Sequence, residues 1–248
     1  MKRGLLFGSL FLILCLLVGH YTLNPPETST ESTASNCSAR QEVAFETEQL
    51  QSVPAPVFEK EHMEVTSIAY DGMQFTLYQL TGDDHYYLYM TLAGTNYDLG
   101  LVGNRNSNLD RMRESMVQKT SISAAEAIYA LRREEAFEIL TTTYFTIREN
   151  TPILLYSLPG TGRQCDVDED GQVETISNGG LSTSPNYLLY EWKADAGEVC
   201  VADLREQLSC DTLVFDDADG CFAADKKIDS EWVRSKYQYD GIYLEKIG

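Results

Sequence analysis

The sequence predicts an α+β domain that is mostly β, with antiparallel meanders and one helix, following an N-terminal signal or anchor helix. From residue 63 onward, short segments rich in β-branched and aromatic residues alternate with turn residues, which is typical of strands. Among these segments, residues 124–140 have helical spacing. Near the N-terminus, Lys2 and Arg3 precede a long uncharged apolar run, the pattern of an export signal.

The composition predicts a folded protein and excludes one broad class of partner. The chain has 248 residues, of which 43% are hydrophobic and 23% charged, so a packed core is expected. Its formal net charge is −19 at pH 7. Binding to phosphate backbones needs clustered Lys and Arg, so we expect no nucleic-acid partner.

Residues 1–23 form the predicted signal peptide or membrane anchor. Cleavage, lipidation at Cys15 and retention all stay open, although a lipidation site prefers a small residue before the cysteine and Leu14 is large. If retained, the run is about 20 residues long, enough to span a bilayer. With Lys2 and Arg3 inside, the rest of the chain would face outward. Each alternative predicts an extracytoplasmic protein, membrane-anchored or secreted.

Residues 24–56 are predicted to be a flexible acidic linker, because they are rich in Pro, Ser, Thr and Glu and poor in apolar side chains. A short helix at residues 39–51 is an alternative, since Ser38 and Gln41 have capping-box spacing. The β-rich extracellular domain then comprises residues 57–248.

Within this domain, Asp71-Gly72 predicts a type I′ hairpin turn, because both central residues of that turn need a positive φ. A four-strand meander is expected at residues 63–70, 73–80, 86–92 and 97–102, followed by a loop at 103–108. Ser123 and Glu126 have capping-box spacing, which favours a helix over residues 124–140. One helical turn is expected at 203–208, and further strands at 141–147, 153–158, 173–177, 187–192, 199–201, 212–215, 221–224, 236–239 and 242–247.

The one motif that carries chemistry is an aspartate loop at residues 166–174, which fits the calcium pattern D-x-D-x-D-G-x-x-E. Calcium binds six to eight oxygen ligands, and a glycine at the sixth position permits the sharp bend. The predicted metal ligands are the carboxylates of Asp166, Asp168, Asp170 and Glu174 and the peptide oxygen of Gln172.

The loop departs from a full EF-hand in ways that predict weak binding. Ser177 stands where the EF-hand has a bidentate Glu, and the flanking segments resemble strands. We therefore expect a dissociation constant of about 10⁻⁴–10⁻³ M, as in extracellular modules. The alternative is a solvated acidic turn that holds no ion.

The aspartate loop and the following segment Asn186-Tyr187-Leu188-Leu189-Tyr190-Glu191-Trp192-Lys193 together resemble a single FG-GAP or VCBS-type repeat. More broadly, residues 97–248 are similar to uncharacterised exported or lipid-anchored proteins of Gram-positive bacilli that carry one such loop. The resemblance implies a β-rich extracellular module with bound calcium and no established activity. A complete propeller is not expected, because one loop is present and no repeat recurs.

Two further motifs are interpreted as turns. The segment Leu158-Pro159-Gly160-Thr161-Gly162 matches the sortase pattern, but a long acidic segment follows it in place of a hydrophobic tail. The segment Asp216-Asp217-Ala218-Asp219-Gly220 lacks the calcium-loop spacing and predicts a tight hairpin.

The cysteines leave two alternatives open. After Cys15 and Cys37, four remain, and export permits them to form two disulfides or to stay as isolated buried thiols. The four are Cys165, Cys200, Cys210 and Cys221.

The function predicted from these features is that of a non-enzymatic cell-envelope protein, tethered to the membrane by its N-terminal segment, with one structural calcium loop. Its partner would be an envelope protein or a polysaccharide. One alternative is a secreted hydrolase that cleaves polysaccharide through paired carboxylates. A Ser-His-Asp site would need His62 or His85, and the sequence has no G-x-S-x-G motif. Another alternative is a lipid-anchored sensor or partner-binding subunit.

Overall fold

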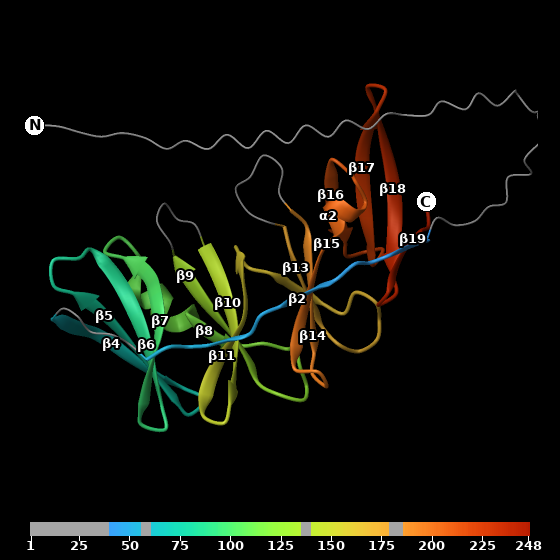
Figure 1. The fold of residues 1–248 in the computed structure, drawn as a ribbon. Helices are drawn as coiled ribbons and strands as arrows, with labels where there is room; N and C mark the ends of the chain where they lie inside the picture. Colours follow the sequence, from blue (N-terminus) through green and yellow to red (C-terminus); the bar gives the residue numbers. More distant parts are fainter. Residues whose placement is uncertain (1–39, 56–60, 135–139, 179–185) are drawn as a thin grey trace, which may run out of the picture. The chain divides into compact units, whose positions relative to one another are not determined.

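In the computed structural model, the described residues from 40 to 248 form mainly antiparallel strands, which make four sheets within one compact unit (Figure 1). The predicted mostly β, antiparallel fold is confirmed. Helix is limited to two short elements among the described residues, α1 (Leu109–Ser115) and α2 (Leu204–Gln207). The signal or anchor helix predicted at 1–23 lies outside the described residues, which are 40–55, 61–134, 140–178 and 186–248.

The first sheet is the predicted four-strand meander. Its first hairpin turns at Asp71 and Gly72, which have φ values of 49° and 78°, as a type I′ turn requires. Its strand order is β4 (His62–Tyr70), β5 (Met73–Leu80), β6 (His85–Leu92) and β7 (Thr95–Asn104).

The other three sheets each have five strands. The second has the order β3 (Gln51–Ser52), β11 (Thr151–Pro159), β10 (Leu140–Arg148), β9 (Ile128–Glu134) and β8 (Val117–Lys119). The third has the order β12 (Arg163–Cys165), β13 (Glu174–Ser177), β14 (Leu188–Lys193), β15 (Glu198–Asp203) and β2 (Glu46–Glu48). The fourth has the order β1 (Arg40–Glu42), β19 (Tyr243–Lys246), β18 (Glu231–Tyr239), β17 (Cys221–Ile228) and β16 (Thr212–Asp216).

Three hydrophobic cores connect successive sheets. Phe75 and Leu88 of the first sheet pack in one core with Phe145 of the second. Tyr156 of the second sheet stacks on Tyr190 of the third, with ring centroids 4.4 Å apart. The third core joins the third and fourth sheets through the side chains Leu189, Ala202, Phe222 and Leu244. The second and third sheets are therefore buried on both faces.

The helix predicted at 124–140 is wrong for residues 128–134, which form β9; residues 135–139 lie outside the described part. Consecutive β9 residues enter opposite cores, with Tyr129 in the first core and Ile128 and Ala130 in the second. A strand buried on both faces has no polar alternation, so its apolar spacing imitates a helix. Ser123 accepts hydrogen bonds from the backbone N–H groups of Ala125 and Glu126, at 3.1 and 3.3 Å, and so caps a turn.

Residues 40–55, which we call the strap, correct both the linker prediction and the alternative helix at 39–51. They form β1, β2 and β3, each paired with the edge of a different sheet (blue in Figure 1). Pro54 also accepts a hydrogen bond from the N–H of Asp98 in the first sheet, at 2.7 Å. Backbone pairing with preformed edges needs few apolar side chains, so composition does not reveal such strands. Residues 24–39 and 56 of the predicted linker lie outside the described residues.

Most of the other predicted elements correspond to observed strands. The helical turn predicted at 203–208 is α2, and Asp203 caps it by accepting from the N–H of Glu206 at 3.1 Å. Residues 217–220 form the expected hairpin turn between β16 and β17, and residues 160–162 connect β11 to β12, whereas Leu158 and Pro159 still belong to β11. In the part of the chain that the structure describes, no helix is long and apolar enough to cross a membrane.

Candidate metal centre

The aspartate loop is the connection of a hairpin between β12 and β13, where Cys165 pairs with Glu174. The chain reverses through two residues of positive φ, Glu169 at 62° and Gly171 at 88°. Glycine adopts this conformation without steric cost, which accounts for its place at the sixth position of the loop.

Three of the five predicted ligands converge. Asp166, Asp168 and Glu174 each offer one carboxylate oxygen, and these oxygens all lie within 4.8 Å of one another. Asp166 is exposed, Asp168 is half-buried and Glu174 is buried at 5% exposure. Burial therefore increases across the site, from the exposed Asp166 to the buried Glu174.

The backbone of the loop fixes these carboxylates. Asp166 accepts a hydrogen bond from the N–H of Gly171 at 3.0 Å, and Glu174 accepts one from the N–H of Val167 at 2.8 Å. Asp168 accepts from the N–H of Asp170 at 3.2 Å. Each carboxylate is thus oriented from within the loop.

Asp170 is not among the converging carboxylates, and it pairs with Gln172. The carboxylate of Asp170 accepts from the backbone N–H of Gln172 at 2.7 Å and from its side-chain amide at 2.8 Å. The backbone hydrogen bond lowers the pKa of Asp170. Both residues are exposed and pair with each other.

Uncompensated negative charge is the main electrostatic feature of the site. Burial, together with the charges of Asp168, Glu191 and Asp170, raises the pKa of Glu174 to about 7. Burial first, and then neighbouring carboxylates, also raises the pKa of Asp168. A divalent cation would offset the burial and the mutual repulsion of the Glu174 and Asp168 carboxylates. Hard carboxylate oxygens suit calcium or magnesium.

A fourth acid lies behind the loop. Glu191 on β14 is 5% exposed, accepts a hydrogen bond from the hydroxyl of Tyr239 and forms an ion pair with Lys193. Burial and the bond to Glu191 raise the pKa of Tyr239, which keeps its proton on the donor oxygen. Sequence reasoning did not select Glu191, although an acid inside the apolar run of β14 is a usable indication of a buried charge.

The loop also contacts the fourth sheet. A Cβ placed on Gly241 would lie 2.6 Å from Oδ2 of Asp168. Gly241 lies between β18 and β19 with a φ of 86°. The neighbouring Asp240 accepts hydrogen bonds from the N–H groups of Ile242 and Tyr243 and forms an ion pair with Arg40 of the strap. The aspartate loop, this turn and the strap are therefore contiguous.

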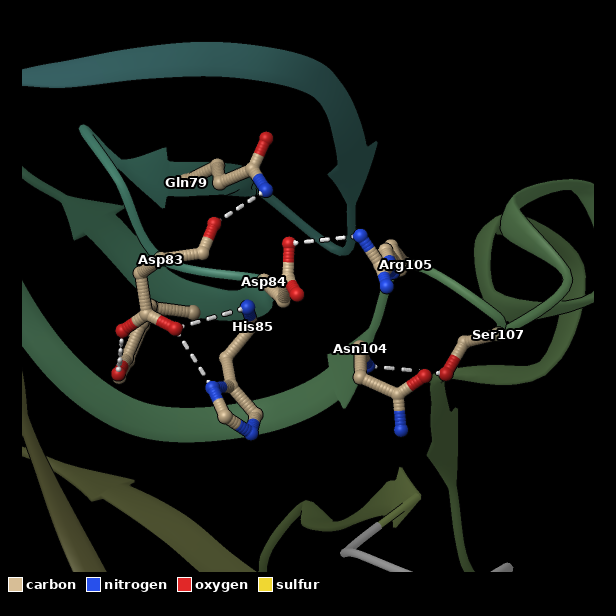
Figure 2. Close-up of polar contacts among 8 residues, drawn as sticks. Gln79, Asp83, Asp84, His85, Asn104, Arg105 and Ser107 are labelled. Carbon is tan, nitrogen blue, oxygen red and sulfur yellow. Dashed lines mark hydrogen bonds and ion pairs between the residues drawn. The ribbon is translucent and has the colours of Figure 1, made fainter.

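A second polar cluster surrounds His85 at the start of β6 (Figure 2). Asp83 contacts Nδ1 of His85 at 2.6 Å and accepts from the hydroxyl of Tyr87 at 2.8 Å. Hydrogen bonds from Tyr87 and His85 lower the pKa of Asp83 to about 2. Among the described residues, no hydrogen bond joins His85 to a serine; the nearby Ser107 accepts from the N–H of Asn104 at 3.1 Å. The cluster thus pairs a histidine with an aspartate but includes no serine bonded to that histidine. Its hydrogen bonds fix the turn before β6.

The four cysteines within the described residues are free thiols. Cys210 and Cys221 are buried, and Cys165 and Cys200 are half-buried. Burial raises the pKa of all four, which disfavours the reactive thiolate. The structure therefore has the isolated thiols and not the two disulfides that the sequence left open.

No protein-family model matches the chain, and neither a curated protein nor a solved structure matches it. The resemblance of the aspartate loop to an FG-GAP or VCBS-type repeat stays a prediction.

Proposed function

We propose that this chain is an exported, membrane-tethered, non-enzymatic protein of the cell envelope, in which one calcium ion orders the aspartate loop. The observation that carries the proposal is the convergence of Asp166, Asp168 and Glu174 within 4.8 Å. Three carboxylates at this spacing repel one another unless a cation or a proton neutralises them.

Calcium fits the site better than magnesium does. The three carboxylates come from a short hairpin loop, and calcium tolerates irregular sets of oxygen ligands completed by water. Magnesium requires near-ideal octahedral geometry at shorter distances. Since the Asp170 carboxylate is held by Gln172, the peptide oxygen of Gln172 and water would complete the coordination, which agrees with weak binding in the range of about 10⁻⁴–10⁻³ M.

The ion would have a structural role. Through Gly241, the loop on the third sheet reaches a turn of the fourth sheet, and Asp240 of that turn binds Arg40 of the strap. Neutralising Asp168 and Glu174 would therefore stabilise the region where two sheets meet the chain arriving from the predicted membrane tether.

The hydrolase alternative requires two carboxylates that face each other across a cleft. The three acids that converge here share one short loop and point to a common centre. This arrangement favours an ion over a bound polysaccharide.

Calorimetric titration of the full chain tests the metal site. We expect saturable calcium binding that is lost in Asp168→Ala and kept in Asp195→Ala, which removes an exposed acid from the turn between β14 and β15. Magnesium should bind more weakly than calcium. Absence of heat with the unmodified chain would refute the calcium site.

The tether is tested separately by membrane fractionation and by the mass of the mature N-terminus. Retention of residues 1–23 predicts an intact chain in the membrane fraction, whereas diacylation at Cys15 predicts loss of residues 1–14. A chain recovered unprocessed from the cytosol would refute export without bearing on calcium binding.

A further inference from the structure

A polar pocket of about 230 Å³ lies where the second sheet meets the segment leading into β12. One wall comes from β8, β9 and β10, and the other from Thr161, Gly162 and Gln164. Two of the lining residues are small, Ala130 and Gly162, and a Cβ on Gly162 would lie 3.2 Å from the hydroxyl oxygen of Tyr144, which also lines the pocket. The sortase-like segment thus forms part of the rim.

The charge of this pocket is opposite to that of the chain. Among the described residues, Lys119 and Arg132 line it and no acidic residue does. Within the described residues, neither cation forms an ion pair with an acid. Two positive charges in a concave site focus the local potential and attract anions, even though the chain carries a formal charge of −19. A guanidinium also binds carboxylate or phosphate through two parallel hydrogen bonds.

The uncharged lining groups add acceptors for hydroxyl groups. The hydroxyls of Thr120 and Thr142 donate to the carbonyls of Ile128 and Gly160, at 3.1 and 2.6 Å. Their protons are used, and the Thr120 hydroxyl also accepts from the N–H of Ile122 at 3.4 Å, so each hydroxyl keeps acceptor capacity, one lone pair on Thr120 and two on Thr142. A ligand that satisfies both kinds of group carries an anionic group for the cations and hydroxyl groups for the threonines.

The hydroxyl of Tyr144 adds a hydrogen-bond donor to the lining. Ser121 donates to the side-chain carbonyl of Gln164 at 3.5 Å, and the Gln164 side chain also hydrogen-bonds to the hydroxyl of Tyr144. With its carbonyl occupied by Ser121, Gln164 directs its amide N–H to Tyr144, which leaves the Tyr144 proton for a ligand acceptor. Tyr144 is 2% exposed, so this donor is fixed in place.

We propose that this pocket binds one sugar-sized, hydroxyl-bearing anion, a sugar acid or a sugar phosphate. The anionic group pairs with Arg132 and Lys119, and ring hydroxyls donate to Thr120 and Thr142. The volume is below the range of about 300–1,000 Å³ that holds drug-sized ligands, which limits the occupant to a single ring. None of the predicted metal ligands lines this pocket, and its occupancy does not depend on the proposed function.

Calorimetric titration of the full chain with four probes tests the proposal. Glucuronate and glucose 6-phosphate should bind saturably, and glucose and inorganic phosphate should bind at least about tenfold more weakly, because each lacks one of the two required groups. The ratio between glucuronate and glucose 6-phosphate identifies the preferred anionic group. No saturable binding of either anionic sugar, or equal binding of glucose and glucuronate, would overturn the proposal.

Three variants in the pocket and one control outside it locate the site. Arg132→Gln should weaken binding of the anionic sugars about tenfold, while Arg111→Gln, an exposed cation on α1 with the same change in charge, should leave it unchanged. Lys119→Gln, at an exposed position, should also weaken binding of the anionic sugars, and it serves as the test if Arg132→Gln does not fold. Thr161→Trp fills the exposed rim without changing the charge and should abolish binding. Equal weakening by Arg111→Gln and Arg132→Gln would show a general charge effect and overturn the site.

Discussion

Asp168 on the third sheet's loop packs against Gly241 on the fourth sheet's turn, so closely that a Cβ on residue 241 would lie 2.6 Å from Oδ2 of Asp168. The two residues are far apart in the sequence and belong to different sheets. Their contact makes the candidate metal centre a property of the assembled fold.

Gly241→Ala should therefore impair both stability and calcium binding. The substituted residue would have to keep a φ of 86° and would displace the Asp168 carboxylate. We expect a loss of about 1–3 kcal/mol in the free energy of unfolding and a weaker calcium affinity. Urea unfolding and calorimetry measure the two effects.

Gly72→Ala is the matched control, because Gly72 has a φ of 78° and a Cβ added there would meet no atom within 4 Å. It should lower stability by a similar backbone cost and leave calcium affinity unchanged. If both variants bind calcium like the unmodified chain, Gly241 does not position Asp168.

Glu174 should make the calcium-free protein less stable as the pH rises. Its pKa is about 7 in the folded state, against an ordinary value of 4.5, so the folded state holds a proton that the unfolded state has lost. The contribution of Glu174 to stability is therefore fully present below about pH 4.5 and is lost, by about 3 kcal/mol, as the pH rises from there through about 7. Urea unfolding in a chelator at pH 5 and pH 7.5 measures this loss.

Glu174→Gln keeps an acceptor for the N–H of Val167 and should remove most of the pH dependence. Saturating calcium should reverse the trend for the unmodified chain, since the ion binds the deprotonated carboxylates. A calcium-free protein with equal stability at both pH values would contradict the burial of this acid.

The strap should contribute to stability through its two buried valines. Val43 and Val53 are 6% and 4% exposed and belong to different cores. Replacing either with Ala should cost about 1–3 kcal/mol, whereas Val214→Ala, at 58% exposure, should change stability by less than about 0.5 kcal/mol. Denaturant unfolding of the three variants makes the comparison.

Deleting residues 1–56 should destabilise the protein further, because it opens one edge on each of three sheets. Unfolding of the shortened chain at the same urea concentration as the full chain would show that the strap is dispensable.

Tyr239→Phe should destabilise the contact between the third and fourth sheets. It removes the hydroxyl that donates to the buried Glu191 and leaves Lys193 as the remaining partner of that carboxylate. An underpartnered buried charge costs about 1–3 kcal/mol. Tyr243→Phe, at a half-buried residue that is not bonded to Glu191, should have a smaller effect on thermal unfolding, and equal effects would argue against this bond.

Local turn chemistry could be predicted from the sequence. The turn at Asp71-Gly72 needs two positive φ values, and that pair of residues supplies them whatever the rest of the fold does. Likewise, the aspartate spacing and Gly171 select a tight acidic loop, and three of the five predicted ligands converge there.

Strands that depend on distant partners could not be predicted in the same way. Residues 128–134 have apolar side chains on both faces, which is compatible with a helix until two cores are seen to enclose them. The strap is mostly polar and pairs through its backbone with the edges of three sheets, and those edges are formed by residues distant from it in the sequence.

The sequence by itself determined the antiparallel β architecture and the acidic loop, because alternation, turn residues and ligand spacing act over a few neighbouring positions. Only the tertiary structure decided which oxygens converge and placed Glu191, Tyr239 and Gly241 around them. Those three residues lie on other strands and turns, far from the loop in the sequence. Their burial, their contacts and their effect on the charge of the loop arise only when the folded chain brings them close to it.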